Sequence, residues 1–442
     1  MFKIDKSYTE ILRISFPVSL ALIIPFLNLS INNFFLGQLG ELELGTAGIT
    51  GVYYLLIAML GNGFHSAIQS IIARRVGEER NDEIGKTFSF GFLISQIFSF
   101  FFILITLYLT PFFFRLFIKD PEVYNLAIRF INIRVWGLPF LYIFQLCNAF
   151  FMGTTNTRFL MFGTIAQAGS NIILDYFLIF GFGVISPLGF QGAAWASVIS
   201  EIIGMFFIVW VLMNNKFHTQ FQLMRRVKVH FPTIKLIVKT SLPLMGQYAI
   251  SLISWLIFYL LIEHLGERSL AISNLMRNIF AFTGIFIWAL ATTTNTMVSQ
   301  LIGQKNEAAI IPLIHKTMHL SLLFSITLFI LLNLSPTFFL QAFGLSDSFI
   351  NAGVPVLRMV TFAIIFQSAA VVWLNAVTGT GKTFINLLIE ITAIIFYGLY
   401  IYAVIEKYNM SLVWAWASEI VYWVTIIVLA ITYIYKGNWK SR

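Results

Sequence analysis

The sequence contains very little cysteine and little charge. Its one cysteine, Cys147, cannot form an intrachain disulfide or a CxxC metal site. Charged residues make up 11% of the 442 residues, whereas soluble domains carry roughly a quarter. Hydrophobic residues make up 58%, and the mean hydropathy is +0.85. The composition therefore excludes an ordinary soluble domain and indicates a membrane-embedded chain.

Long apolar segments fill most of the sequence. A helix needs about 20 apolar residues to cross roughly 30 Å of hydrocarbon, and backbone polar groups must be satisfied within that segment. The longest connection between such segments is about 215–236, which is too short for a soluble catalytic domain, so we expect no enzyme. The apolar segment from Ile11 lacks a signal-peptide cleavage pattern and is expected to be a retained first helix. We predict twelve spans, at about 12–36, 46–70, 87–110, 125–152, 159–181, 191–213, 237–262, 271–297, 312–336, 350–377, 384–405 and 411–435.

The formal net charge of +9 does not indicate nucleic-acid binding, because Lys and Arg are concentrated in every second connection between the predicted spans. The opposite connections hold only Arg115, Lys119, Arg268 and Lys407. This asymmetry follows the positive-inside rule and places both termini in the cytoplasm. The richest basic segments are 3–13, 74–86, 216–239 and 436–442.

Two patterns resemble enzyme motifs but lack their context. AVTGTGKT at 376–383 matches a relaxed phosphate-binding loop, yet it joins two predicted membrane helices, so we interpret it as a turn. His315 and His319 lack the intervening Glu of a zinc protease. We therefore expect no cofactor and no resident metal.

An internal repeat appears when the chain is aligned with itself so that position n matches position n + 226. Each half holds six predicted helices, so both halves have the same orientation and a pseudo-twofold axis along the membrane normal is expected. The fold class is therefore an all-α integral membrane protein with two six-helix lobes, at 1–214 and 237–442, joined by a cytoplasmic linker at 215–236. The matching landmarks are Pro17 with Pro243, Gly77 with Gly303, and Gly153 with Gly379.

An unusual acidic residue lies inside the fifth predicted span, in NIILDYFLIF at 171–180. Asn171 and Asp175 are four residues apart and therefore share one helix face. A charge at mid-depth costs at least roughly 2.5–3.5 kcal/mol on insertion scales, and protonation or ion binding would remove it. The alternative is a structural Asp held by Asn171 and nearby hydroxyls. The repeat places Tyr397 and Ile401 at these positions in the second lobe, so the pair is specific to the first.

Three further acids lie within predicted spans. Glu390, Glu419 and Glu201 are candidate secondary acidic sites, because intramembrane acids are functional candidates by default. The alternative is that Glu390 or Glu419 pairs with Arg358 or with a backbone group. For the cations within the spans, snorkelling or internal ion pairing is the expected role. These cations are Arg129, Arg134, Arg277 and Arg358.

Aromatic residues are abundant, with 47 Phe, 16 Tyr and 10 Trp. Most must face lipid or pack between helices, but some could line an apolar cleft for planar amphipathic compounds. The candidates are Tyr53, Tyr54, Trp136, Tyr248, Trp255, Trp288, Trp373 and Tyr397.

The chain resembles the MATE (multidrug and toxic compound extrusion) family of twelve-helix transporters. NNFFLGQLGELELGTAGI at 32–49 is similar to that family's motif after the first helix, and IIARRVGEER at 71–80 is similar to its basic loop. The most specific similarity runs from GTTNTRF through NIILDYFLIFGFG to PLGFQGAAWASVIS, between residues 153 and 200. The resemblance covers essentially the whole chain.

This resemblance implies an ion site in the first lobe. In the archaeal and related branches of the family, this site joins an Asp on the first helix to an Asn and an Asp on the fifth, and a hydroxyl residue on the sixth also contributes. By position these are Asn32, Asn171, Asp175 and Ser197, so the first acid is replaced by an amide. Another branch uses a Glu on the seventh helix, and that position holds Ser251 here. One carboxylate implies one proton or one Na⁺ bound transiently at Asp175, and a divalent cation is not expected.

We therefore expect a secondary efflux transporter in the cytoplasmic (inner) membrane, which exchanges drugs or amphipathic metabolites for H⁺ or Na⁺ by alternating access. It would act as a monomer on small molecules within the bilayer. The nearest alternative is a lipid-linked oligosaccharide or lipid flippase of the same superfamily, for which Arg134, Arg277 and Arg358 would face the cleft. A membrane enzyme would need a polar cluster that the sequence does not suggest, and a channel fits two lobes with midplane acids less well.

Overall fold

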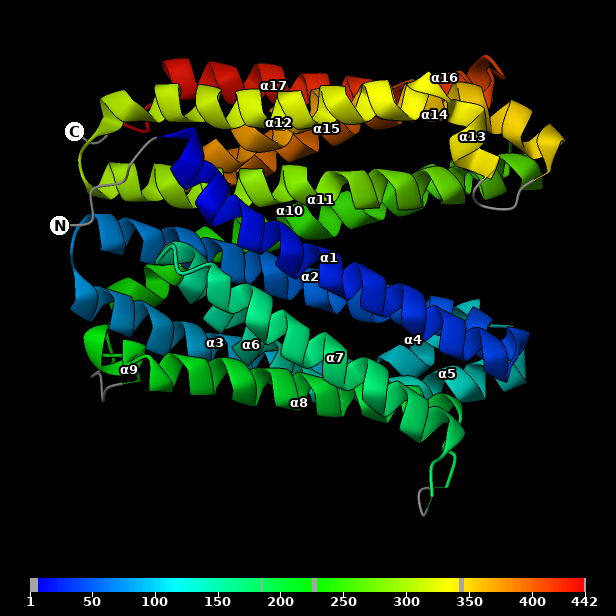
Figure 1. Cartoon of the computed structure of the whole chain (residues 1–442), viewed down its shortest axis with the longest axis horizontal. Helices are drawn as coiled ribbons and strands as arrows, with labels where there is room; N and C mark the ends of the chain where they lie inside the picture. The colour runs from blue at the N-terminus through cyan, green and yellow to red at the C-terminus, as the bar shows by residue number, and fades with distance from the viewer. Residues whose placement is uncertain (1–6, 184–185, 225–228, 342–345, 441–442) are drawn as a thin grey trace. The chain divides into compact units, whose positions relative to one another are not determined.

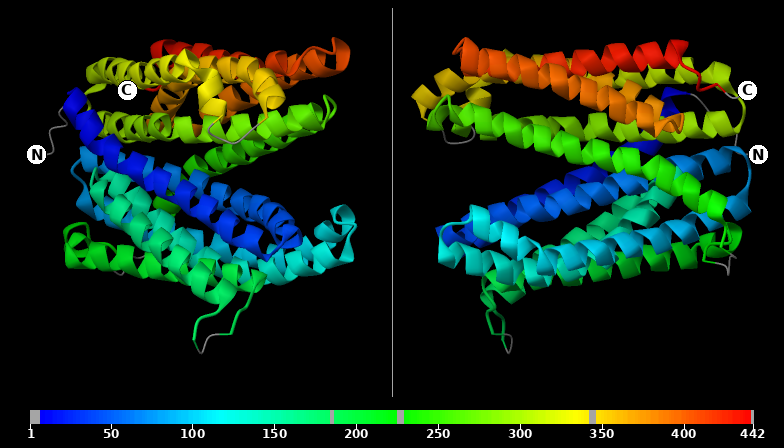
Figure 2. Two further views of the ribbon diagram at one scale, coloured as in Figure 1. Left: turned by 45° about the vertical axis from the view of Figure 1, so that its right-hand side comes forward. Right: turned by 180° about the vertical axis from the view of Figure 1, so that it is seen from behind.

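The computed structural model describes residues 7–183, 186–224, 229–341 and 346–440. The long helices of each half lie side by side along a common direction (Figure 1, Figure 2). Some of the basic residues used to predict topology, at 1–6, 225–228 and 441–442, lie outside the described residues.

The first half contains α1 (Tyr8–Leu39), α2 (Glu41–Gly77), α3 (Asn81–Tyr108), α4 (Thr110–Phe117), α5 (Pro121–Arg134), the 3₁₀ turn η1 (Val135–Gly137), α6 (Leu138–Gly153), α7 (Arg158–Phe180), α8 (Phe190–Asn214) and α9 (Phe217–Gln220).

The second half repeats this order of elements. It contains α10 (Phe231–Glu263), α11 (Glu267–Gly303), the 3₁₀ turn η2 (Glu307–Ala309), α12 (Ile310–Leu334), α13 (Pro336–Gln341), α14 (Asp347–Gly379), α15 (Thr383–Tyr402), the π turn η3 (Ala403–Lys407), α16 (Leu412–Trp416) and α17 (Ser418–Lys436). The predicted all-α fold is confirmed by these elements.

Eleven helices among the described residues are long and apolar enough to cross a membrane. The twelfth predicted span is α7, which has 23 residues and therefore a length of about 35 Å at 1.5 Å per residue. Its apolar sequence is interrupted by the polar side chains of Gln167, Asn171 and Asp175. The candidate ion site thus lies on the one predicted span that is not among these eleven helices.

The element boundaries reproduce the internal repeat found in the sequence. Adding 226 to the first and last positions of α2 gives those of α11, and the same offset relates the bounds of α3 to η2–α12 and those of α5–α6 to α14. The offset falls to 222 between α8 and the pair α16–α17. The repeat is therefore confirmed for most of each half and drifts toward the last helices.

Two glycines at equivalent positions explain how closely the repeated helices pack. A Cβ added to Gly153 would lie 2.8 Å from Ile72 Cγ2 and 3.0 Å from the main-chain oxygen of Gln69. A Cβ added to Gly379 would lie 2.8 Å from Val298 Cβ and 2.9 Å from the main-chain oxygen of Asn295. Each glycine lets the end of its helix approach a neighbouring backbone, which a larger residue would prevent.

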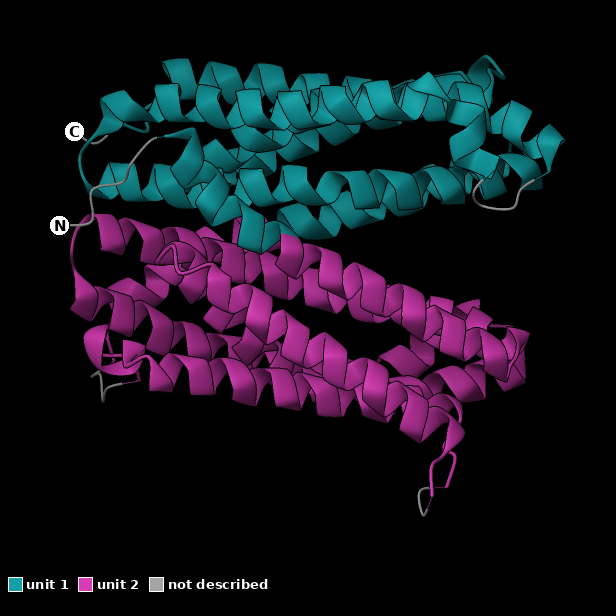
Figure 3. Cartoon of the chain, viewed as in Figure 1, with its two compact units in different colours: residues 1–19, 246–442 teal, residues 20–245 magenta. Residues whose placement is uncertain are grey.

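The chain forms two compact units, shown in Figure 3: Met1–Ser19 with Gly246–Arg442 (unit 1), and Leu20–Met245 (unit 2). The boundary differs from the predicted lobes, because it falls within α1 and α10 rather than in the segment 215–236. Ile11 and Ile14 of α1 lie in the same hydrophobic core as Phe258 and Ile310. The first residues of α1 therefore belong to the core of the second half of the chain.

Part of the predicted linker packs against unit 2. Phe217 lies 6.0 Å from Phe150 and 5.7 Å from Phe159, measured between ring centroids. Gly85 on α3 leaves no space for a side chain beside the main-chain oxygen of Phe221. The segment after α8 is therefore held on the ends of α3, α6 and α7.

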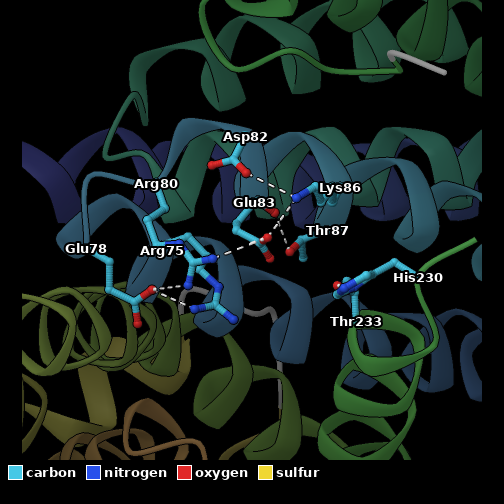
Figure 4. A network of polar contacts seen from close by, with 9 residues as sticks. All are labelled: Arg75, Glu78, Arg80, Asp82, Glu83, Lys86, Thr87, His230 and Thr233. Atoms are coloured by element: carbon cyan, nitrogen blue, oxygen red, sulfur yellow. Dashed lines mark hydrogen bonds and ion pairs between the residues drawn. The ribbon is translucent and has the colours of Figure 1, made fainter. Parts of the chain in front are cut away.

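Ion pairs hold the turn between α2 and α3 (Figure 4). Arg75 donates to Glu78 at 2.6 Å, and Glu83 accepts from Lys86 at 2.9 Å and pairs with Arg80 at 3.3 Å. Several of these side chains are partly exposed, so each pair contributes roughly 0–1 kcal/mol. The equivalent turn of unit 1, at 301–312, has one acidic residue, Glu307, so the cluster of acids at this turn is specific to unit 2.

Candidate functional site

Asp175 lies in α7 with no exposed surface. Neither of its carboxylate oxygens has a hydrogen-bond partner among the described residues. Burying an ionised carboxylate without a partner is strongly unfavourable, so such a group either becomes neutral or binds a cation. Asp175 therefore has the chemistry of a site that takes up and releases a positive charge.

An amide pair lies beside this carboxyl group. Asn28 Nδ2 on α1 donates to Asn171 Oδ1 at 2.7 Å, and Asn171 is four residues before Asp175 on the same face of α7. Asn28 Oδ1 and Asn171 Nδ2 have no partner among the described residues. The site thus offers three side-chain oxygens with free acceptor capacity, two from Asp175 and one from Asn28.

Asn28 was not among the residues selected from the sequence. The prediction by resemblance named Asn32, which lies one helical turn further along α1, is half-buried and has no side-chain contact with Asn171 or Asp175 among the described hydrogen bonds. A search of α1 for polar residues on the face of Asn32 would have found Asn28, because residues four apart share a face.

Ser197, the predicted hydroxyl ligand, is half-buried on α8, the helix that packs most extensively against α7. Its main-chain oxygen accepts a hydrogen bond from Ser200 Oγ at 2.8 Å. The structure therefore brings the helix of Ser197 to the site, and no hydrogen bond between its side chain and Asp175 is present among the described residues.

A second acid of unit 2, Glu201, is held in an ion pair. Arg134 Nη1 and Nη2 donate to the two Glu201 carboxylate oxygens at 2.8 and 2.6 Å. The guanidinium lies 3.7 Å from the centre of the Tyr54 ring, and the Tyr54 hydroxyl donates to Glu201 at 3.1 Å. Gly137 leaves space for both side chains, since a Cβ there would clash with Glu201 Oε2.

The break between α5 and α6 positions Arg134 for this contact. α5 ends at Arg134, a 3₁₀ turn follows, and α6 begins with Pro139 in its first turn, where the missing N–H costs nothing. Arg134 also interacts electrostatically with Asp175. Arg134 is bonded to Glu201, however, and no ion pair among the described residues includes Asp175.

Unit 1 contains a buried acid with a different environment. Glu390 on α15 accepts hydrogen bonds from Ser251 Oγ on α10, from Tyr422 on α17 at 2.5 Å and from Gln247 on α10 at 3.3 Å. Ser251 is the position at which the resemblance predicted a family acid to be missing. The structure thus brings a carboxylate from another helix to that position.

Glu419 is buried at the start of α17. It accepts a hydrogen bond from Trp423 Nε1 at 3.0 Å, and its position in the first helical turn is one where the helix dipole favours an acid. Glu419 therefore has a local structural explanation. Neither it nor Glu390 forms an ion pair with Arg358 among the described residues, and Arg358 is exposed.

The other membrane cations are exposed side chains. Arg277 lies 5.2 Å over the ring of Tyr259, and Arg129 is on the exposed face of α5. Of the four predicted intramembrane cations, Arg134 is the one held inside a unit.

The predicted cleft aromatics do not form one group. Trp373 and Tyr397 are buried in the core of unit 1, which leaves little of either ring accessible to a compound. Trp136 and Trp288 are exposed, at 51% and 42% of their surface. The remaining predicted aromatics, all half-buried, are Tyr53, Tyr54, Tyr248 and Trp255.

Two of these half-buried rings have specific partners. The Tyr53 hydroxyl lies 2.8 Å from Thr106 Oγ1 and 2.6 Å from Thr110 Oγ1. Trp255 stacks on Tyr259 at a centroid distance of 6.1 Å. Both rings thus contribute to packing within their own units.

The two enzyme-like patterns have structural roles. Residues 376–383 span the end of α14 and the start of α15, as the turn interpretation predicts. His315 and His319 contact Tyr435 and Tyr8. Among the described residues, no group of three His, Cys, Asp or Glu side chains gathers in a way that could hold a metal ion.

Known proteins share this sequence pattern and this fold. The chain is 23% identical over 325 residues to a probable multidrug resistance protein NorM of Thermotoga maritima, covering 73% of this chain and 69% of that protein. It is 22% identical over 293 residues to the multidrug export protein MepA of Staphylococcus aureus, covering 66% and 64%. Its fold matches a solved transporter of the MOP superfamily from Pyrococcus furiosus with a TM-score of 0.88 and 19% identity, over 97% and 95% of the two chains.

The family comparison covers both units. The MatE family model matches residues 17–177 and 243–404, which include α7 with Asp175 and α15 with Glu390. The two matched segments begin at Pro17 and Pro243, which are equivalent positions of the internal repeat. The chain therefore belongs to the MatE family of membrane transporters, as its motifs predicted.

Proposed function

We propose that the protein is a secondary active exporter that extrudes drugs or amphipathic metabolites in exchange for H⁺ or Na⁺. The observation that carries the proposal is the buried Asp175 carboxyl, whose oxygens have no partner among the described residues. The names of the NorM and MepA relatives, which refer to multidrug resistance and multidrug export, support the same direction of transport.

Neutralisation of Asp175 supplies the energy that couples the ion to the compound. Moving the ionised Asp175 side chain from water into the buried position costs at least roughly 2.5–3.5 kcal/mol on insertion scales. A difference of that size changes an equilibrium between two states by roughly a hundredfold or more. Ion binding can therefore favour the state in which Asp175 is buried, and release of the ion favours the state in which it is accessible.

The composition of the site favours a monovalent ion. Asp175 supplies one formal charge, and the neighbouring Asn28 and Asn171 side chains are neutral amides. Ca²⁺ needs six to eight oxygen ligands and commonly several carboxylates. One proton or one Na⁺ would neutralise Asp175 completely.

The charge pattern supports a location in the cytoplasmic membrane with both termini on the cytoplasmic side. Apolar faces of the long helices would lie against lipid, and the compound would enter within the bilayer or at its surface. We expect a single chain to be sufficient, since both units of the repeat are present in it.

The flippase alternative requires cations that remain available to a phosphate-bearing lipid. The Pyrococcus furiosus transporter is itself described as having a binding pocket of reverse polarity, which suggests a different function for that protein. In this chain Arg134 is neutralised by Glu201 at 2.6 and 2.8 Å. That pairing argues against the flippase at Arg134, the one of its three predicted cations that is held inside a unit.

Transport by the purified protein in vesicles tests the proposal. An imposed pH or Na⁺ gradient should drive uptake of fluorescent amphipathic compounds by the wild type, and Asp175→Asn should abolish the gradient-dependent part. Asp347→Asn, at an exposed position at the start of α14, is the matched control and should retain wild-type transport. Full gradient-driven transport by Asp175→Asn would contradict the proposal.

A further inference from the structure

Glu390 is a buried carboxyl group for which the coupling mechanism at Asp175 has no role. It is 1% exposed and lies in the second turn of α15. Its partners come from two other helices of unit 1: Ser251 and Gln247 from α10, and Tyr422 from α17. All three partners are neutral side chains.

No cation compensates this carboxyl group among the described residues. None of the ion pairs of the described chain includes Glu390. The contrast with Glu201 is direct, because Glu201 is equally buried but bonded to Arg134. A buried ion without a counter-charge is unfavourable, so Glu390 must be neutralised by a proton or a bound cation for at least part of its cycle.

The hydrogen bonds around Glu390 suit a group that changes protonation state. The hydroxyl groups of Ser251 and Tyr422 can each donate to a carboxylate or accept from a carboxylic acid. The same two hydroxyl groups can therefore hydrogen-bond with Glu390 in both its ionised and its protonated state. The other titratable groups near this cluster among the described residues are also acids. Tyr248 on α10 interacts electrostatically with Glu390, Glu419 on α17 interacts with Tyr422, and the Tyr397 ring lies 5.8 Å from that of Tyr422.

A row of polar side chains runs from this cluster to the end of α14. Gln247 Oε1 accepts from Asn386 Nδ2 at 3.2 Å, and Asn386 Nδ2 also donates to Thr378 Oγ1 at 2.8 Å. Thr378 is next to the last residue of α14, and Lys382 in the following turn is exposed. Asn386 Oδ1 is buried and has no partner among the described residues, so it can accept from a water molecule that enters along this row.

The repeat shows that the two acids occupy different positions along equivalent helices. α7 and α15 correspond in the repeat, and Glu390 matches Thr164, whereas Asp175 matches Ile401. The two positions are therefore about three helical turns apart, or about 16 Å along a helix axis. Glu390 lies near the start of its helix and Asp175 near the end of its own.

We propose that Glu390 is a second proton-binding site, in unit 1, which exchanges protons with water through the turn between α14 and α15. The step is a simple transfer: a hydronium ion gives its proton to the Glu390 carboxylate and leaves a neutral carboxylic acid and a water molecule. The positive-inside pattern places this turn on the cytoplasmic side. The inference does not depend on Asp175 being the coupling residue, because it rests on contacts within unit 1 alone.

Infrared difference spectroscopy of the full-length protein in lipid tests this directly. Spectra at acidic minus alkaline pH should contain a carboxylic-acid C=O band that Glu390→Gln removes and Asp175→Asn leaves in place. Tyr422→Phe should shift that band to higher frequency, because the acid loses a hydrogen-bond donor. This second variant keeps the test valid even if the glutamine variant folds poorly.

Two further measurements define the site. In D₂O, Asn386→Leu should slow the deuterium shift of the Glu390 band relative to the wild type, because the row of polar side chains is interrupted. Addition of Na⁺ at constant pH should not change the band.

A spectrum that Glu390→Gln and Tyr422→Phe leave unchanged would overturn the proposal, and loss of the band on adding Na⁺ would assign the site to a metal cation instead. Asp175→Asn with normal transport but an intact Glu390 band would contradict only the proposed function.

Discussion

Glu201→Gln would leave the Arg134 guanidinium inside unit 2 without its counter-ion. Arg134 is 14% exposed and Glu201 3% exposed, and both Glu201 oxygens are bonded to the guanidinium. Glutamine has nearly the same shape, so the substitution removes a charge and little else. The amide oxygen of the glutamine can still accept from Arg134, whereas its amide nitrogen, a hydrogen-bond donor, would face an N–H donor of the guanidinium.

The expected cost follows from this geometry. Removal of one partner of a buried ion pair destabilises a protein by about 3–5 kcal/mol. The Tyr54 ring, 3.7 Å from the guanidinium, keeps its cation–π contact in the variant, so the Arg134 charge is not left wholly uncompensated and the low end of this range applies. We therefore expect about 3 kcal/mol, which for a unit of roughly 150–250 residues lowers the melting temperature by roughly 6–12 °C.

The single cysteine provides the assay. Cys147 lies in α6 of unit 2 and is a buried, free thiol, so a fluorogenic thiol reagent should report the unfolding of that unit. Asp82→Asn is the matched control within unit 2, because the Lys86–Asp82 pair is partly exposed, at 30% and 51% of the side chains, and should be worth less than about 1 kcal/mol.

A double variant separates charge from packing. Arg134→Met combined with Glu201→Gln leaves no buried charge and should melt above Glu201→Gln alone, since apolar replacement of a buried pair is often tolerated. A Glu201→Gln protein that melts at the same temperature as the Asp82→Asn control would refute the reasoning, as would a double variant that melts below Glu201→Gln.

Two other predictions test the repeat and the amide pair. Gly153→Ala and Gly379→Ala should each lower stability by about 1–3 kcal/mol through overpacking, measured by thermal unfolding, and an increase in melting temperature for either would contradict the packing at the helix ends. Asn28→Leu should leave the Asn171 oxygen without its hydrogen-bond donor, at a cost of about 1–3 kcal/mol, and so weaken the apparent affinity for the coupling ion roughly tenfold in the vesicle assay. Asn32→Leu, one helical turn away, should have a smaller effect on that affinity. A larger effect of Asn32→Leu would assign the contact to Asn32.

Local patterns in the sequence predicted the helices and the repeat well. Apolar segments longer than a bilayer crossing specify helices with little ambiguity, and constant spacing of Gly153 and Gly379 reflects the same close packing in both halves. The position of Asn171 and Asp175 on one face of α7 was also predictable, because a helix fixes which residues share a face.

Contacts between distant residues were not predictable from one sequence. Arg134 and Glu201 are 67 residues apart, and Ser251 and Glu390 are 139 residues apart. No local periodicity connects such residues. The choice of Asn28 over Asn32 depends on the rotation of α1 against α7, and the unit boundary depends on which core takes the first residues of α1.

The central claim is that Asp175 holds the coupling ion and releases it when a compound binds. The most direct measurement is the release of protons, or of radioactive Na⁺, from purified protein in detergent when a transported compound is added at constant pH. Wild type should release one monovalent ion per chain, and Asp175→Asn should bind the compound without any release. Equal release by wild type and Asp175→Asn would contradict the claim.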